Sequence, residues 1–451
     1  MSFRIDERRS GITKSDNLED ELQRKIDTTI KMLEITSKID VKEAKKLLAE
    51  IQSSGADLKK ESWNKIKRIR ECLEGKTKRR KRGTDKDILE KLEQIIGKSL
   101  PYLETFDEEG EIGTKWAGDA VVGLKLSGCR LMTFPEPIFQ LKSLQWLDLG
   151  GNGITTLPER IVELKNLQIL DLGTNGLTTF PERILELKNL QELDIGSNGL
   201  RTLPGFFGQF KSLQILDLSY NHLETLPDFF GELKSLQTLS LMENPLTTFP
   251  EPIFQLKSLR SLDLSANGIK TLPKRILELK NLQELYLEGT WITTLPEYFW
   301  QLQALQTLDL SYTGLKKLPE SFSELKSLQW LRLEGNGIKT LPEPIVELKN
   351  LQELYLYENQ LRALPESFGQ LESLQTLDLR DNQLTMLPEA FGNLGALEWL
   401  DLRGNQIITL PKSLFQLSNL EILFIGGNPL DSNSKKSLDR LGARVEYTYF
   451  K

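Results

Sequence analysis

A group of aromatic and arginine residues recurs in the second half of the chain, mostly at positions between leucines. The group comprises Tyr286, Trp291, Tyr312, Trp330, Arg332, Tyr355, Tyr357, Arg380, Trp399 and Arg403. Rings and guanidinium groups bind other molecules by stacking, cation–π contact and forked hydrogen bonds, and they dominate interface energetics. We therefore interpret the group as a partner-binding surface. The alternative is that the rings stack on one another across neighbouring strands.

An acidic column precedes this group. Asp148, Asp171, Asp194 and Asp217 follow one another at intervals of 23 residues, and Asp263, Asp309, Asp378 and Asp401 hold the same phase. Carboxylates about 5 Å apart repel by about 0.8 kcal/mol in water. In one interpretation the Leu-Asp-Leu pattern is a structural feature of the repeat, with hydrogen-bonding neighbours absorbing this repulsion. In the other, the acidic stripe attracts a basic partner or a cation.

The sequence offers little for catalysis. It contains no phosphate-binding loop, no zinc-hydrolase motif, no paired cysteines and no nucleophile elbow. The only histidine is His222, and the only cysteines are Cys72 and Cys129. Cys129 lies four repeats from His222, roughly 19 Å by strand spacing, which is too far for a nucleophile–base pair. We predict a protein that is not an enzyme and needs no cofactor or metal.

A short basic segment stands apart from the acidic remainder of the chain. Residues 59–82 hold twelve Lys or Arg against three Glu, whereas the whole chain has a net charge of −6. The densest part consists of Lys76, Lys78, Arg79, Arg80, Lys81 and Arg82. Three interpretations stay open: a solvated linker, contact with nucleic acid or an anionic membrane, and docking on the acidic face of the same chain.

One 23-residue pattern, L-x-x-L-x-L-x-x-N-x-L-x-x-L-P-x-x-I/F-x-x-L-x-x, repeats fourteen times from Val121 to Leu430. Such a period predicts a solenoid whose units bury their apolar sides against their neighbours. The alternating leucines predict stacked parallel strands, and the asparagine amide is expected to bind backbone groups at the turn. Thr290 and Thr313 replace this asparagine, which predicts looser turns there. The proline at thirteen sites predicts an outer side of extended chain or short 3₁₀ turns.

These columns resemble the cytoplasmic leucine-rich repeat proteins with the L-P-x-x-I/F signature, which include Ras-suppressor-type proteins, plant intracellular Ras-group proteins and Roco repeat domains. The resemblance covers residues 121–430. It implies an α/β solenoid and a protein-binding function, often connected with small GTPases or their regulators. It identifies no individual binding residue.

The expected organisation has five parts. Residues 1–14 are expected to be a disordered tail, 15–98 a small all-α domain that contains the basic segment, 99–120 a lead-in, 121–430 the repeats and 431–451 a cap with a short helix and a closing strand. The last helix of the α domain is expected to begin at Thr84 or Asp85, to bury Ile88, Leu89, Leu92, Ile95 and Ile96, and to lie against the solenoid.

Taken together, the sequence predicts a monomeric, cytoplasmic scaffold that binds a folded protein through its concave face. The cytoplasmic expectation depends on the two distant cysteines and on the lack of a signal peptide or an apolar span. Regulation of a small GTPase is one alternative function. Binding of nucleic acid or membrane through residues 59–82 is another.

Overall fold

The computed structural model describes residues 84–104, 112–439, 441 and 444–446. The chain divides into two compact units, residues 1–87 and 88–451. The basic segment, the expected tail and the first three expected helices lie outside the described residues, so the expectations about them stay predictions.

One sheet of sixteen strands, with the strands in chain order, runs through the second unit. β1 (Gly113–Ala117) pairs antiparallel with β2 (Ala120–Lys125), and all later pairs are parallel. The later strands are β3 (Trp146–Asp148), β4 (Ile169–Asp171), β5 (Glu192–Asp194), β6 (Ile215–Asp217), β7 (Thr238–Ser240), β8 (Ser261–Asp263), β9 (Glu284–Tyr286), β10 (Thr307–Asp309), β11 (Trp330–Arg332), β12 (Glu353–Tyr355), β13 (Thr376–Asp378), β14 (Trp399–Asp401), β15 (Ile422–Phe424) and β16 (Arg444–Glu446). From β3 to β15 each residue pairs with its equivalent 23 positions later.

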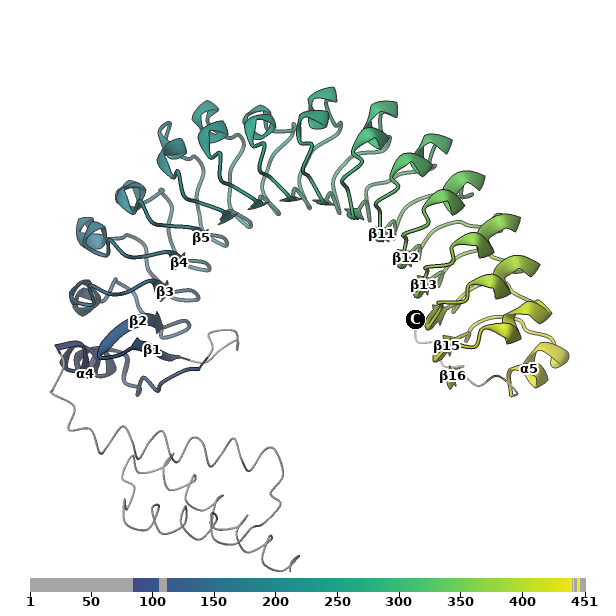
Figure 1. The fold of residues 1–451 in the computed structure, drawn as a ribbon, viewed down its shortest axis with the longest axis horizontal. Coiled ribbons are helices and arrows are strands. Elements are labelled where there is room, and N and C mark those ends of the chain that lie inside the picture. Colours follow the sequence, from purple (N-terminus) through teal and green to yellow (C-terminus); the bar gives the residue numbers. More distant parts are fainter. Residues whose placement is uncertain (1–83, 105–111, 440, 442–443, 447–451) are drawn as a thin grey trace, which may run out of the picture. The chain divides into compact units, whose positions relative to one another are not determined.

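Short 3₁₀ helices alternate with the strands and occupy the outer side of the curve, while the strands line its inner side (Figure 1). They are η1 (Glu136–Gln140), η2 (Glu159–Glu163), η3 (Glu182–Glu186), η4 (Phe207–Gln209), η5 (Asp228–Glu232), η6 (Glu251–Gln255), η7 (Lys274–Glu278), η8 (Glu297–Gln301), η9 (Glu320–Glu324), η10 (Glu343–Glu347), η11 (Glu366–Gln370), η12 (Glu389–Asn393) and η13 (Lys412–Gln416). The repeat proline directly precedes twelve of them; in η4 it lies three residues earlier, at Pro204. The predicted solenoid with its 3₁₀ outer side is confirmed.

The leucine columns form one continuous hydrophobic core between the strands and the 3₁₀ helices. In the second repeat, for example, Leu147, Leu149, Ile154 and Ile161 are fully buried. A buried aliphatic side chain contributes about 1.5–3 kcal/mol, and each unit has several of them. The core therefore holds neighbouring units together along the whole array.

The recurring asparagine binds backbone groups at the turn through its amide, as predicted, and the structure shows that it also connects adjacent units. Asn221 accepts a hydrogen bond from Leu200 N–H at 3.0 Å and donates to the carbonyls of Ile195, Leu218 and Ser219, each at 3.1 Å. The side chain is only 3% exposed. The bonds to Leu200 and Ile195 cross to the preceding unit, so one side chain closes its own turn and fastens it to the neighbour.

The two threonines in this column make fewer bonds. Thr290 Oγ1 donates to Leu287 O at 2.7 Å, and Thr313 Oγ1 donates to Leu310 O at 2.9 Å, both within their own units. Among the described residues, neither threonine makes the bonds to the preceding unit that asparagine makes. Thr313 Oγ1 also donates to Asn336 Oδ1 of the following unit at 3.0 Å. The structure thus shows a loss of bonds to the preceding unit, and the expected loosening of the turns stays a prediction.

Both ends of the core are covered. Helix α4 (Thr84–Ile96) buries Ile88, Leu89 and Leu92 in the solenoid core, although Ile95, expected on the same face, is 52% exposed. At the other end, helix α5 (Ser432–Leu438) is N-capped by Asp431, whose carboxylate accepts Ser434 N–H at 2.7 Å. No helix in the described part of the chain has the length and apolar character needed to cross a membrane.

Glycines in some outer helices allow close packing between units. A Cβ added at Gly369 in η11 would lie 1.8 Å from the carbonyl oxygen of Ala390 in the next unit. No residue larger than glycine fits there without displacing backbone. At Gly205, in contrast, nothing lies within 4 Å of an added Cβ.

We expect Gly369→Ala to lower the free energy of unfolding by about 1–3 kcal/mol, because overpacking forces backbone shifts. Gly205→Ala is the control and should leave stability unchanged or slightly higher. Urea denaturation followed by circular dichroism measures both. Equal stability of the two variants would contradict the close approach of η11 and η12.

The asparagine column gives a second prediction. Asn221→Ala should cost about 1–3 kcal/mol, because it leaves buried backbone groups without partners. Thr290→Asn should instead raise stability by restoring the bonds to the preceding unit. Thermal unfolding tests both changes, and a lower midpoint for Thr290→Asn would show that its turn has no room for the amide.

Candidate functional site

The candidate site is the concave face, which we define as the side chains that point outward from β2–β15 and from the second residue after each strand. In β11 the first and third residues, Trp330 and Arg332, are half-buried, whereas Leu331 between them is fully buried. This alternation follows from the period of two in a strand. The concave face is thus built from positions that the core does not need.

Three rings of this face, Tyr286, Trp330 and Tyr355, form an aromatic cluster across β9, β11 and β12. The ring centroids of Tyr286 and Trp330 lie 6.4 Å apart, and those of Trp330 and Tyr355 lie 6.0 Å apart, both edge to face. Glu353 Oε2 accepts hydrogen bonds from Trp330 Nε1 at 2.8 Å and from Tyr355 OH at 2.7 Å. One carboxylate therefore fixes the orientation of two rings.

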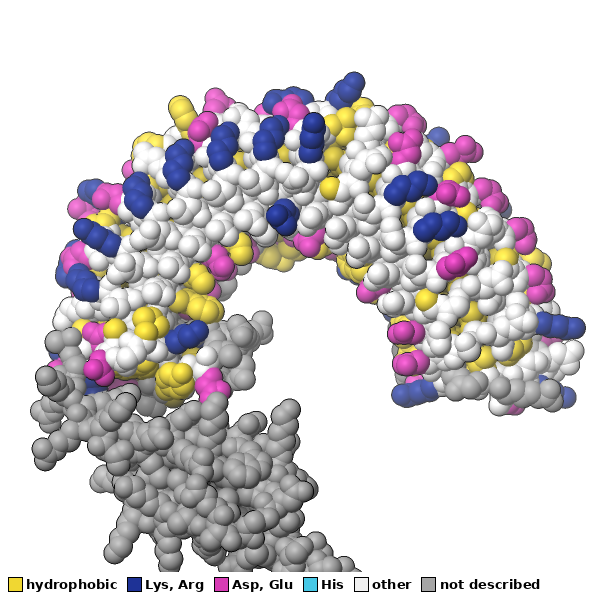
Figure 2. Space-filling view, in the orientation of Figure 1, with side chains coloured by type: hydrophobic (Ala, Val, Ile, Leu, Met, Phe, Trp, Pro, Cys, Tyr) yellow, Lys and Arg dark blue, Asp and Glu magenta, His cyan; other side chains and the backbone are white. Residues whose placement is uncertain are grey.

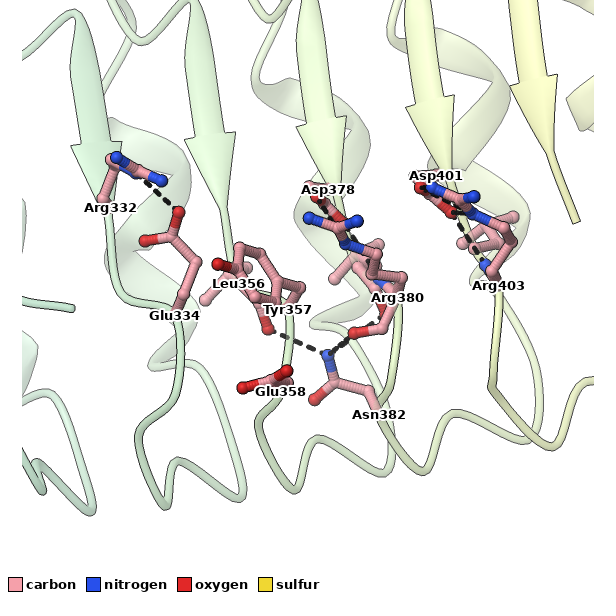
Figure 3. Close-up of polar contacts among 12 residues, drawn as sticks. Arg332, Glu334, Leu356, Tyr357, Glu358, Asp378, Arg380, Asn382, Asp401 and Arg403 are labelled. Carbon is pink, nitrogen blue, oxygen red and sulfur yellow. Dashed lines mark hydrogen bonds and ion pairs between the residues drawn. The ribbon is translucent and has the colours of Figure 1, made fainter. Parts of the chain in front are cut away.

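Arg332 lies against the aromatic cluster, and its guanidinium group points toward the carboxylate of Glu334 (Figure 3). Its guanidinium carbon is 5.5 Å from the centroids of both Trp330 and Tyr355. Its Nε donates to Glu334 Oε1 at 2.5 Å. Burial raises the pKa of Glu334, while the Ser311 hydroxyl and Arg332, which both donate to it, oppose the shift.

A second group lies beside this cluster. Tyr357 OH is 2.9 Å from Tyr312 OH, and the Arg380 guanidinium lies 4.3 Å from the centroid of the Tyr357 ring. Arg380 Nε is 3.1 Å from Asp378 Oδ2. Tyr312 is 42% exposed, with its ring directly over Gly335, where an added Cβ would lie 2.1 Å from the ring. Aromatic, cationic and anionic groups alternate here over β12 and β13.

The other predicted residues lie apart from these two groups. Arg403 pairs with Asp401, and its guanidinium is 4.6 Å from the centroid of Phe424, which also lies 5.7 Å from the ring of Trp399. Trp291 follows the asparagine column and is not on a strand; it is 62% exposed, with Lys270 Nζ 5.4 Å from its ring. The structure therefore does not bring Trp291 into the aromatic cluster.

Sequence reasoning missed two members of the site. Glu353 orients Trp330 and Tyr355, and Phe424 packs against Trp399. The parallel register gives a signal for both, because Glu353 pairs with Trp330, and Phe424 lies next to the strand of Trp399. A search of residues 23 positions away would have found Glu353.

The acidic stripe, Asp148, Asp171, Asp194 and Asp217, runs in register across β3–β6. One oxygen of each accepts the backbone N–H two residues later, at 2.7–2.9 Å. Burial, reinforced by the charge of Asp194, raises the pKa of Asp171 to about 7. Burial raises the pKa of Asp194 to about 6 against its Gly196 bond. The acidic stripe therefore has the backbone hydrogen bonds expected of a structural feature, and its aspartates also repel one another, as a charged binding surface would.

Groups with catalytic potential are dispersed. His222 is exposed and Cys129 is half-buried. Burial raises the pKa of the Cys129 thiol, which disfavours the thiolate. In the described ranges no three His, Cys, Asp or Glu side chains converge as metal ligands. A polar depression of about 530 Å³ is lined by Gln214, Lys234, Gln237, Arg260 and Gln283.

Comparison with protein families matches most of the repeat region. A model described as leucine-rich repeat region matches residues 123–198, 282–357 and 299–383. Models described as leucine rich repeat match residues 188–246, 234–292, 373–394 and 385–430. A search of curated proteins finds no match.

Several solved structures are similar to the chain. An LRR protein of Leptospira interrogans is 37% identical, with a TM-score of 0.62, over 72% of this chain and 95% of its own. The PEPR1–AtPEP1 crystal structure is 30% identical, with a TM-score of 0.57, over 74% of this chain and 50% of its own. The Toll–Spatzle complex of Drosophila is 26% identical, with a TM-score of 0.58, over 68% of this chain and 48% of its own.

The raised pKa of Asp171 predicts a pH-dependent effect of Asp171→Asn. The folded-state pKa, about 7, exceeds the unfolded value of about 3.9. The neutral acid is therefore favoured in the folded state, and its contribution to stability is present below about pH 4 and lost as the pH rises through 7. Asparagine resembles the neutral acid and keeps an acceptor for Gly173 N–H.

We expect Asp171→Asn to stabilise the protein by about 1–2 kcal/mol at about pH 8 and to change little at about pH 4. Thermal unfolding of variant and parent at both pH values measures this difference. Glu224→Gln, at an exposed carboxylate, is the control and should show no such dependence. A pH-independent effect of Asp171→Asn would refute the assigned cause.

Proposed function

Because the chain belongs to the leucine-rich repeat family, we propose that it is a non-enzymatic scaffold that binds a folded protein partner through its concave face. Two of the similar structures are named as two-component assemblies, PEPR1–AtPEP1 and Toll–Spatzle. The proposed setting is the cytoplasm, since the chain has only two cysteines and no clusters of them.

The observation that carries this proposal is the fixed yet accessible aromatic cluster. Trp330 and Tyr355 are both hydrogen-bonded to Glu353 and packed edge to face, but each keeps part of its surface exposed. Side chains that are already ordered lose little rotamer freedom when a partner binds. A core of leucines does not need these rings, which distinguishes them from structural aromatic residues such as Phe322 and Phe368, both fully buried.

The arginines support the same location. Arg332 and Arg380 place their guanidinium carbons over aromatic rings and have their charge balanced by Glu334 and Asp378. Aromatic and arginine side chains at the centre of a surface are typical of interface hot spots. We therefore place the centre of the interface on β9–β13, with Trp399 and Arg403 at its border.

Trp330→Ala is expected to abolish capture of the partner. Loss of a hot-spot residue costs about 2 kcal/mol or more, roughly a 30-fold weaker complex. Affinity purification with the full chain identifies the partner, and titration with the purified partner then compares variants. A small GTPase, or a regulator of one, as the partner would agree with the family resemblance.

Trp291→Ala is the matched control, since Trp291 is an exposed tryptophan outside the aromatic cluster. It should bind as the parent does, and both variants should keep the circular dichroism spectrum of the parent. Undiminished binding by Trp330→Ala and Tyr355→Ala would remove this cluster from the interface.

A further inference from the structure

The concave face has a strong excess of negative charge. Its carboxylates are Asp148, Asp171, Glu192, Asp194, Asp217, Asp263, Glu284, Glu288, Asp309, Glu334, Glu353, Asp378 and Asp401, and its cations are Lys125, Arg332, Arg380 and Arg403. Figure 2 shows acidic and hydrophobic side chains along the inner rim, while basic side chains gather toward the outer part of this side. The face is therefore acidic even though the adjoining outer surface is mixed.

The cations of this face are already engaged. Arg332 pairs with Glu334, Arg380 with Asp378 and Arg403 with Asp401. Lys125 lies beside Asp148 in the strand register. In the part of the chain that the structure describes, no cation forms an ion pair with Asp171, Asp194, Asp217 or Asp263. A cationic group of a second molecule could therefore contact these side chains without displacing an existing ion pair.

The excess charge extends to the aromatic cluster. Tyr286 lies in register between Asp263 on β8 and Asp309 on β10, and Glu284 and Glu288 are two residues away on either side in its own strand segment. Burial raises the pKa of Tyr286 to about 12, and the charges of Glu284, Asp263 and Asp309 add to this shift. An aromatic ring among carboxylates is a favourable environment for an ammonium or guanidinium group.

We propose that the partner presents a lysine- and arginine-rich protein surface whose cationic side chains contact Asp171, Asp194 and Asp217 and the carboxylates around Tyr286. This inference rests on the proposed function and specifies the chemistry of the partner. The occupant is a polypeptide because the carboxylates are spread at one per repeat, about 4.8 Å apart. A metal ion needs oxygen ligands that converge within about 2.0–2.6 Å, and a nucleic acid is repelled by the same charges.

The test uses the full chain and a fluorescein-labelled peptide of alternating arginine and glycine. We expect binding that weakens as salt rises to about 0.15 M and above, since screening acts on exposed charges. The combined variant Asp171→Asn, Asp194→Asn, Asp217→Asn should bind the peptide about tenfold more weakly. Each asparagine keeps an oxygen for the backbone N–H that the aspartate accepts, so the fold is retained; circular dichroism checks this.

A matched variant removes the same number of charges from the outer side. Glu159→Gln, Glu182→Gln and Glu320→Gln lie at the first positions of η2, η3 and η9 and are exposed. This variant should bind the peptide as the parent does. Equal weakening by both triple variants, or no binding of the peptide by the parent, overturns the proposal.

A second variant tests the carboxylates around the ring separately. Glu284→Gln with Glu288→Gln should also weaken peptide binding about threefold to tenfold, and no change overturns the inclusion of this group.

Failure of this inference can be told apart from failure of the proposed function. In one result, partner capture requires Trp330 but is unaffected by the Asp171, Asp194, Asp217 variant. This would support the proposed scaffold function and exclude a basic partner surface. The reverse result is that peptide binding requires the aspartates while partner capture does not require Trp330. It would support recognition through the acidic residues and exclude the aromatic cluster from the interface.

Discussion

The side-chain amide of the recurring asparagine is the interaction on which this structure depends. Every unit must turn its chain out of the sheet, and the turn leaves backbone donors and acceptors away from water. At Asn221 one amide binds four of these groups, two of them in the preceding unit. The leucine core supplies the driving force for stacking, and wherever the asparagine is present its amide adds hydrogen bonds to the preceding unit.

Because the core and the turn use the same positions in each unit, the outward strand positions are free to differ. The first half of the concave face uses them for carboxylates that accept hydrogen bonds from backbone N–H groups, as at Asp171. The second half places arginines against rings and acids, as at Arg332. A regular scaffold therefore presents two chemically different surfaces, one with unbalanced charge and one with ordered rings.

The solenoid could be predicted from the sequence because each column expresses a local rule that repeats: alternating leucines, an amide at the turn, and proline before the outer helix. For the candidate site, the sequence indicated which positions face outward but not which side chains contact one another. Which acid binds Arg332, and that Glu353 orients both Trp330 and Tyr355, depends on rotamers of side chains one repeat apart. Ile95 was placed wrongly because helical periodicity does not reveal where the supporting surface ends.

Thr290 and Thr313 mark two neighbouring units of the described array that lack the asparagine bonds to the preceding unit. Stability in a repeat protein is approximately the sum of the units and their nearest-neighbour contacts, so two consecutive junctions without the crossing amide bonds form a seam. Trp300, with a buried Nε1 that has no hydrogen-bond partner within the described chain, lies in the same stretch. These two junctions therefore add less nearest-neighbour stability than the junctions that carry the crossing amide bonds.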